Sequence, residues 1–218
     1  MMKNEFLKRT LSSIILIPVT LFFIIKGTLF FNFFLLICLL ATIYEWRVLT
    51  KDRFYKITGY LFILISYYFV YLLRNDFEGK YTLFFLILLI CVSTDLGGYI
   101  FGKILKGPKL IKISPNKTYA GMIGAFVLSI ISSSIYLNYY EFFIIKEGEI
   151  LSFYDFIFVI VISSVSQLGD IIISYFKRKS KIKNTGKIIP GHGGILDRID
   201  GMIFAFPSSY LILKVIYQ

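Results

Sequence analysis

The feature that most constrains the fold is a series of long apolar runs separated by short charged segments. A helix that crosses a bilayer needs roughly 20 mostly apolar residues, and runs of about this kind recur along the chain. With 57% hydrophobic residues, the sequence predicts an all-α polytopic membrane protein of about seven transmembrane helices. The expected helices are Leu11 to Ile25, Thr28 to Tyr44, Ile57 to Leu73, Tyr81 to Phe101, Thr118 to Asn138, Phe153 to Phe176, and Gly201 to Tyr217.

The length of 218 residues suits one domain, and neither a large polar block nor an internal repeat interrupts the sequence. We expect a single integral membrane domain over 1–218, in which 1–90 supplies apolar amino-terminal spans and 91–218 carries the motifs. No small-residue cleavage site follows the first apolar run, so we interpret that run as a retained span and not as a signal peptide.

The distribution of Lys and Arg predicts the orientation of the spans. Nineteen of the 24 basic residues fall in alternate loops on one side and five on the other. Because cytoplasmic loops carry the excess of positive charge, the N-terminus is expected in the cytoplasm and the C-terminus outside. The chain has a net charge of +11, and its basic residues lie beside the expected spans. This position favours lipid headgroups or a soluble anion over nucleic acid as the partner.

Four carboxylates are predicted at the cytoplasmic boundary. Asp95 and Asp170 lie inside apolar runs, whereas Asp197 and Asp200, three residues apart at the start of the last run, would share a helix face. A carboxylate in the bilayer costs on the order of 3 kcal/mol unless it meets a partner or water. Each acid could pair with a neighbouring Lys or Arg. Clustered acids also favour a cation, and their hard oxygens favour Mg²⁺.

The segment before the last run has the character of a phosphate-binding loop. It joins a cluster of bases to glycines that let the backbone approach an anion, and a carboxylate pair follows, which together favour phosphoryl or nucleotidyl transfer. His192 lacks further imidazoles for a zinc site, so we expect it to form hydrogen bonds or contact phosphate. The bases and the loop residues are Lys177, Arg178, Lys179, Lys181, Lys183, Lys187, Pro190, Gly191, Gly193 and Gly194.

The stretch "SYFKRKSKIKNTGKIIPGHGGILDRIDG" resembles the signature of the phosphatidate cytidylyltransferase family, also called CDP-diacylglycerol synthases. "TDLGGYIFGK" and "ISPNKTYAG" upstream resemble further elements of that family, so the likeness runs from about Asp95 to Gly201. The signature falls on Ser174, Lys177, Arg178, Lys183, Pro190 to Gly194, Leu196, Asp197, Arg198 and Asp200.

The sequence departs from the family pattern at four positions. Asn184 stands where Asp is usual, Ile173 and Ala120 stand where Glu is frequent, and Gly201 stands where Ser is common. These departures remove three acids from the pattern but leave Asp170, Asp197 and Asp200 in place. We interpret the chain as an active relative.

The resemblance implies transfer of a cytidylyl group from CTP to phosphatidate, with Mg²⁺, giving CDP-diacylglycerol and pyrophosphate. It implies metal ligation by Asp170 and Asp197 first, then by Asp200 and Asp95. The residues expected to hold phosphates or assist the transfer are Lys177, Arg178, Lys183, His192 and Arg198. Those expected to contact substrate are Ser174, Lys117, Gly193 and Gly194.

Two alternatives belong to other classes. A transporter or channel for a cation or a phosphorylated anion would also carry intramembrane acids. A CDP-alcohol phosphotransferase acts at the same boundary, but its motif begins Asp-Gly and repeats Asp at four-residue spacing, which "LDRIDG" does not reproduce. The expected partners are phosphatidate, CTP and membrane lipids, at a multi-pass cell-membrane protein with a cytoplasmic active site. A homodimer is compatible with these expectations.

Overall fold

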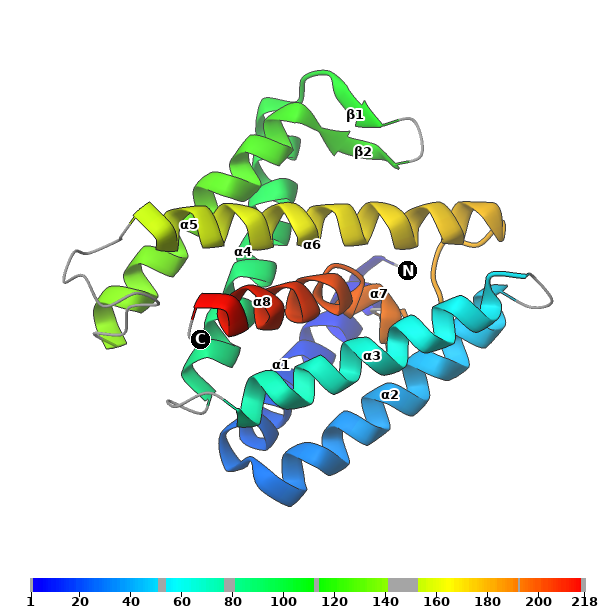
Figure 1. Cartoon of the computed structure of the whole chain (residues 1–218). Coiled ribbons are helices and arrows are strands. Elements are labelled where there is room, and N and C mark those ends of the chain that lie inside the picture. Colours follow the sequence, from blue (N-terminus) through cyan, green and yellow to red (C-terminus); the bar gives the residue numbers. More distant parts are fainter. Residues whose placement is uncertain are drawn as a thin grey trace. The chain divides into compact units, whose positions relative to one another are not determined.

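The protein is mostly helical (Figure 1). The computed structural model describes residues 2–50, 54–76, 81–111, 114–140, 153–191 and 193–216. Its elements in chain order are α1 (Met2–Lys26), α2 (Thr28–Thr50), α3 (Lys56–Asn75), α4 (Tyr81–Leu105), β1 (Lys109–Ile111), β2 (Ser114–Thr118), α5 (Tyr119–Tyr140), α6 (Phe153–Lys179), α7 (Leu196–Ile199) and α8 (Met202–Ile216).

Five of the described helices are long and apolar enough to cross a membrane: α2, α3, α4, α5 and α6. The apolar stretches of α1 and α8 are shorter, Ile14–Lys26 and Met202–Ile216. Large apolar side chains point outward along the helices; Leu29 is 77% exposed and Ile135 66%. Such a surface is stable only against lipid or another apolar partner. The chain is therefore an α-helical membrane protein, and each expected run lies in or overlaps one of the described helices α1 to α6 and α8.

Two local features differ from the sequence prediction. A short antiparallel hairpin of β1 and β2 follows α4, with Ile111 opposite Ser114, where no strand was expected. The expectation that Asp197 and Asp200 begin the last span is wrong. Asp197 lies in the four-residue helix α7, Asp200 is its C-cap, and α8 begins only at Met202.

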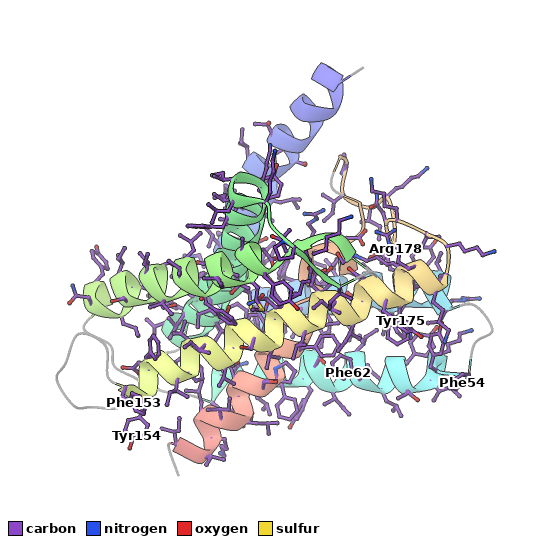
Figure 2. All side chains as sticks on the ribbon, turned by 90° about the horizontal axis from the view of Figure 1, so that it is seen from above. Phe54, Phe62, Phe153, Tyr154, Tyr175 and Arg178 are labelled. Carbon is purple, nitrogen blue, oxygen red and sulfur yellow. The ribbon has the colours of Figure 1, made fainter. Side chains whose placement is uncertain are left out.

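The chain divides into two compact units, Met1–Tyr71 with Phe176–Asp200 and Leu72–Tyr175 with Gly201–Gln218, which we call the first and second units. Helix α6 contributes to both. Figure 2 shows Phe153 and Tyr154 at the start of this helix and Arg178 near its other end. Its basic last turn, Lys177 to Lys179, therefore belongs to the first unit.

In the second unit, α4 and α5 pack closely through glycines. A Cβ on Gly97 would collide with the backbone at Gly124, and one on Gly121 would lie 2.7 Å from the carbonyl oxygen of Gly98. Ser132 Oγ also donates to Ser93 Oγ across the helix pair at 2.6 Å. Small residues and hydroxyl hydrogen bonds are the usual means by which membrane helices associate.

In the first unit, Trp46 holds α2 against α3 and α6. Its indole N–H donates to the carbonyl oxygen of Lys56 at 3.1 Å, and its ring packs edge-on against Phe176 with centroids 5.3 Å apart. Thr42 Oγ1 and the Tyr67 hydroxyl, 2.8 Å apart, add a buried hydrogen bond between α2 and α3. These contacts fix α2 beside the basic end of α6.

Candidate active site

Lys177 joins two of the four predicted acids. Its Nζ lies 3.1 Å from Asp197 Oδ1 and 3.4 Å from Asp200 Oδ2. All three side chains are nearly buried, with relative exposures of 10%, 6% and 11%. In such surroundings a charge is stable only when it is paired and hydrogen-bonded, so the three groups depend on one another.

The other oxygen of Asp197 organises the loop before α7. Asp197 Oδ2 accepts hydrogen bonds from the backbone N–H of Thr185 at 2.8 Å and of Gly194 at 3.0 Å. Thr185 and Gly194 are the two ends of the Gly-rich segment, and one carboxylate oxygen therefore closes this segment into a loop. Asp197 therefore binds the loop through Oδ2 and binds Lys177 through Oδ1.

A residue that the sequence interpretation missed, Glu45, holds the same loop from α2. Its side chain is fully buried. Glu45 Oε2 accepts from Thr185 Oγ1 and from the Leu196 N–H, both at 2.8 Å, and Oε1 accepts from the Ile195 N–H at 2.9 Å. The available signal was the acid itself, because a carboxylate next to an apolar run marks a functional or structural partner.

Glycines let Glu45 and Asp197 approach the loop backbone. A Cβ on Gly186 would lie 2.7 Å from Glu45 Oε1, and one on Gly194 would collide with Thr185 and Glu45. Gly193 has φ of +94°, a conformation that side-chain-bearing residues rarely adopt. The sequence interpretation expects the backbone at Gly193 and Gly194 to contact phosphate. In the structure the Gly193 N–H donates to the Ile189 carbonyl oxygen, and the Gly194 N–H donates to Asp197. Their contact with substrate stays a prediction.

A second ion pair lies in the second unit. Lys117 Nζ, on β2, is 2.6 Å from Asp170 Oδ2 on α6, and it also donates to the Gln167 carbonyl oxygen at 3.3 Å. Ser174 Oγ donates to Asp170 Oδ1 at 3.2 Å. Asp170 and Ser174, one turn apart on α6, are therefore hydrogen-bonded to each other, and their roles toward substrate stay predictions.

The remaining predicted site residues are exposed or lie outside the described part of the chain. Arg178, Lys183 and Arg198 are exposed, and Arg178 Nη1 donates to the Ile182 carbonyl oxygen at 3.4 Å. Asp95, on α4 in the second unit, is also exposed. His192 lies outside the described residues.

Two acids of the first unit, Asp197 and Asp200, converge on one cation. Asp197 and Asp200 both point at one positive charge, the Lys177 ammonium, and carboxylates that converge in this way have the hard-oxygen chemistry that Mg²⁺ prefers. Among the described residues, no group of three or more His, Cys, Asp or Glu side chains is placed to hold a metal ion. A metal here would therefore need further ligands from water or substrate.

The fold and these clusters define a helical membrane protein in which a nearly buried lysine and two acids, Lys177 with Asp197 and Asp200, lie beside a Gly-rich loop. Comparison with known proteins narrows this class. The model of the cytidylyltransferase family matches residues 57–216. The phosphatidate cytidylyltransferase of Staphylococcus saprophyticus is 35% identical over 183 residues, which cover 82% of this chain and 68% of the relative. That of Rickettsia bellii is 34% identical over 219 residues, covering 96% and 91%.

The chain belongs to the phosphatidate cytidylyltransferase family. Lys177, Asp197 and Asp200 all lie within the stretch that the family model matches, whereas Glu45 lies before it. The comparisons do not favour a transporter or a CDP-alcohol phosphotransferase.

Proposed function

We propose that the chain transfers the cytidylyl group of CTP to phosphatidate, giving CDP-diacylglycerol and pyrophosphate. The observation that carries the proposal is the nearly buried Lys177, Asp197 and Asp200 cluster in a chain whose relatives are named phosphatidate cytidylyltransferases. A phosphatidate oxygen attacks the α-phosphorus of CTP, the bond to the bridging oxygen breaks, and pyrophosphate leaves with its electron pair.

Positioning and charge neutralisation are the main tasks of a protein in such a transfer. Lys177 supplies a fixed positive charge, because two carboxylates hold its ammonium in place. Arg178, Lys183 and Arg198 are exposed and attract the triphosphate from solution. Lys117 and Ser174, held by Asp170 in the second unit, are proposed to contact a phosphate oxygen. His192 is proposed to donate a hydrogen bond to phosphate.

We propose that Asp197 and Asp200, which share Lys177 as a partner, would hold Mg²⁺. The resemblance to the family places Asp170 with Asp197 first among the candidate ligands and Asp95 last. When bound, Mg²⁺ supplies positive charge against the phosphate oxygens. We also propose seven spans, a cytoplasmic N-terminus and a cytoplasmic active site, since the bases that support the site lie in the loops that carry the positive excess. CTP is a cytoplasmic nucleotide, and the substrate phosphate lies at the membrane surface.

The proposal is tested with purified protein, phosphatidate in mixed micelles, Mg²⁺ and CTP labelled at the α-phosphate. We expect label in CDP-diacylglycerol and release of one pyrophosphate per lipid formed. Diacylglycerol in place of phosphatidate is the control, because it lacks the attacking phosphate oxygen and should give no product. Lys177→Met should abolish most of the turnover, whereas Lys109→Met, at an exposed position of the hairpin, should leave it near the parent value.

Two outcomes would contradict the proposal. Folded protein that forms no CDP-lipid, but moves labelled nucleotide into vesicles without releasing pyrophosphate, would indicate a transporter. Protein that consumes CDP-diacylglycerol and an alcohol to release CMP would indicate a phosphotransferase.

A further inference from the structure

We propose that Glu45 is a positioning residue for the transfer reaction, whose buried carboxylate fixes the loop from Thr185 to Leu196 and thereby aims Asp197 at Lys177. This inference rests on the proposed function. It concerns a residue on α2, outside the stretch 57–216 that the family model matches, and it gives that helix a role in the chemistry.

Glu45 binds both ends of the loop at once. Its Oε2 holds the Thr185 hydroxyl at one end, and its two oxygens hold the Ile195 and Leu196 N–H groups at the other. Thr185 is 3% exposed and Leu196 is fully buried, so water does not compete for these donors. The separation between the two ends of the loop is therefore set by the width of a single carboxylate.

The same loop ends hold Asp197. The Thr185 N–H and the Gly194 N–H both donate to Asp197 Oδ2, and each lies on or next to a residue that Glu45 binds. Thr185 is thus fixed by two carboxylates, through its N–H and through its hydroxyl. If Glu45 releases the loop, the two donors that orient Asp197 lose their support, and Asp197 Oδ1 is no longer fixed relative to the Lys177 ammonium 3.1 Å away.

The site requires a carboxylate and not merely a polar side chain. Glu45 meets three donors with two acceptor oxygens, whereas glutamine offers one acceptor oxygen and an NH₂ group. Glu45→Gln therefore turns an N–H donor toward at least one of the three donors while it keeps the shape of the side chain. Gly186 and Gly194 leave little space around the carboxylate, so the amide cannot swing into a different position.

Loss of this support should appear in kcat. Glu45→Gln changes no charge on the basic residues that attract CTP, so the ground-state attraction and the KM for CTP are retained. Transfer depends on a more accurate placement of the charged groups than binding does. A supporting residue of this kind typically contributes ten- to hundredfold.

The experiment compares parent, Glu45→Gln, Thr185→Val, the double variant, and two controls. Thr185→Ser keeps the hydroxyl donor. Thr42 lies on the same helix as Glu45, and Thr42→Val removes a buried hydrogen bond with Tyr67 without changing a contact to the loop. Kinetics per folded molecule, with the folded fraction measured by size-exclusion chromatography, are combined with amide hydrogen exchange of the peptide spanning 184–198.

We expect Glu45→Gln to lower kcat by about ten- to hundredfold with the KM for CTP within about threefold, and to speed exchange at Gly194 to Leu196. Thr185→Val should lower kcat less, and the double variant should fall no more than about threefold below Glu45→Gln, because both changes release one loop. Thr185→Ser and Thr42→Val should keep parental kcat and parental exchange in this peptide.

An active parent whose Glu45→Gln variant keeps kcat, or whose two single effects multiply in the double variant, would overturn the inference and leave the proposed function standing. Thr185→Val, which changes only one contact, decides the matter if Glu45→Gln fails to fold. Folded parent without CDP-lipid synthesis would overturn the proposed function, and with it the catalytic part of the inference. The exchange data would still decide whether Glu45 holds the loop.

Discussion

Lys177 Nζ and Asp197 Oδ1 lie 3.1 Å apart, with both side chains at most one-tenth exposed. This pair connects the last turn of α6 to the helix α7, twenty residues further along the chain. Neither group can be neutralised without leaving the other charged in surroundings that water barely reaches. The first prediction concerns this pair.

Asp197→Asn should lower kcat by at least about a thousandfold, which corresponds to roughly 4 kcal/mol in the barrier. The amide keeps one oxygen for the Thr185 and Gly194 N–H groups and turns its NH₂ toward Lys177, so the ion pair is replaced by two opposed donors. Asp200→Asn should cost less, about ten- to hundredfold, because its contact with Lys177 is the longer one at 3.4 Å.

Steady-state CDP-lipid synthesis, corrected for folded protein by size-exclusion chromatography, checks both values. Added Mg²⁺ should restore part of the Asp200→Asn activity and none of the Asp197→Asn activity. Well-folded Asp197→Asn with most of the parental turnover would show that the reaction does not depend on this pair.

The ion pair of the second unit gives a second prediction. Lys117 and Asp170 are 2.6 Å apart, with side-chain exposures of 23% and 29%, so solvent screens their attraction only partly. A double-mutant cycle of Lys117→Met and Asp170→Asn should give a coupling of about 1 kcal/mol or more in the free energy of unfolding. Unfolding in mixed micelles of increasing SDS content measures it. A coupling near zero would mean that the pair contributes little to stability.

The sequence predicted where the helices lie because an apolar run long enough to span a bilayer has few alternatives to a helix. It predicted their ends poorly. The second run was ended at Tyr44, at the first charge, whereas α2 continues to Thr50. Glu45 is the next residue after that expected end, and it was therefore missed. A helix can continue through a charged residue such as Glu45 when a loop distant in the sequence donates hydrogen bonds to its side chain.

The candidate site was predictable in its residue types and not in its contacts. Asp197 and Asp200 were expected on one face of a continuous helix, and they do share a partner in Lys177. The chain turns at Asp200 and Gly201 before α8 begins, however. The Gly193 and Gly194 N–H groups, expected to contact phosphate, donate here to the Ile189 carbonyl oxygen and to Asp197. The periodicity of a helix predicts which residues share a face, but it does not predict which distant group accepts a hydrogen bond from a given donor.

A third prediction concerns the packing of α4 on α5. Gly97→Ala should destabilise the protein by about 1–3 kcal/mol, because the new Cβ would meet the backbone of Gly124 and would lie 2.9 Å from the Ala125 Cα. Gly98→Ala is the matched control one residue away. Its Cβ would have no neighbour closer than 3.9 Å, so alanine should be neutral or stabilising by up to about 1 kcal/mol. Thermal unfolding in detergent compares the two, and equal losses of stability would contradict the close approach of these helices.

The fourth prediction concerns Asn184, where the family pattern usually has Asp. The residue is exposed, and its side chain lies 3.6 Å from the position of a Cβ on Gly193, which is also 2.9 Å from Asp197 Oδ2. Asn184→Asp should leave kcat within a few-fold of the parent, because nearby bases such as Lys183 offset the added charge. A change of about a hundredfold in either direction, near 2.7 kcal/mol, would instead show that the loop of this chain is adapted to the amide.

The last prediction concerns the orientation of the spans, which rests on the nineteen basic residues sorted to one side. Lys106 follows the basic end of α4, and the sorting assigns it to the cytoplasm. Lys146, outside the described residues, is assigned to the opposite face. Single cysteines at these two positions, in a background with Cys38 and Cys91 replaced by alanine, should react differently with a membrane-impermeant maleimide. In intact cells Lys146→Cys should be labelled and Lys106→Cys protected, and both should react once the membrane is permeabilised. Labelling of both in intact cells would mean that the two loops lie on the same face of the membrane. The assignment of α5, which lies between them in the chain, as a single span would then be wrong.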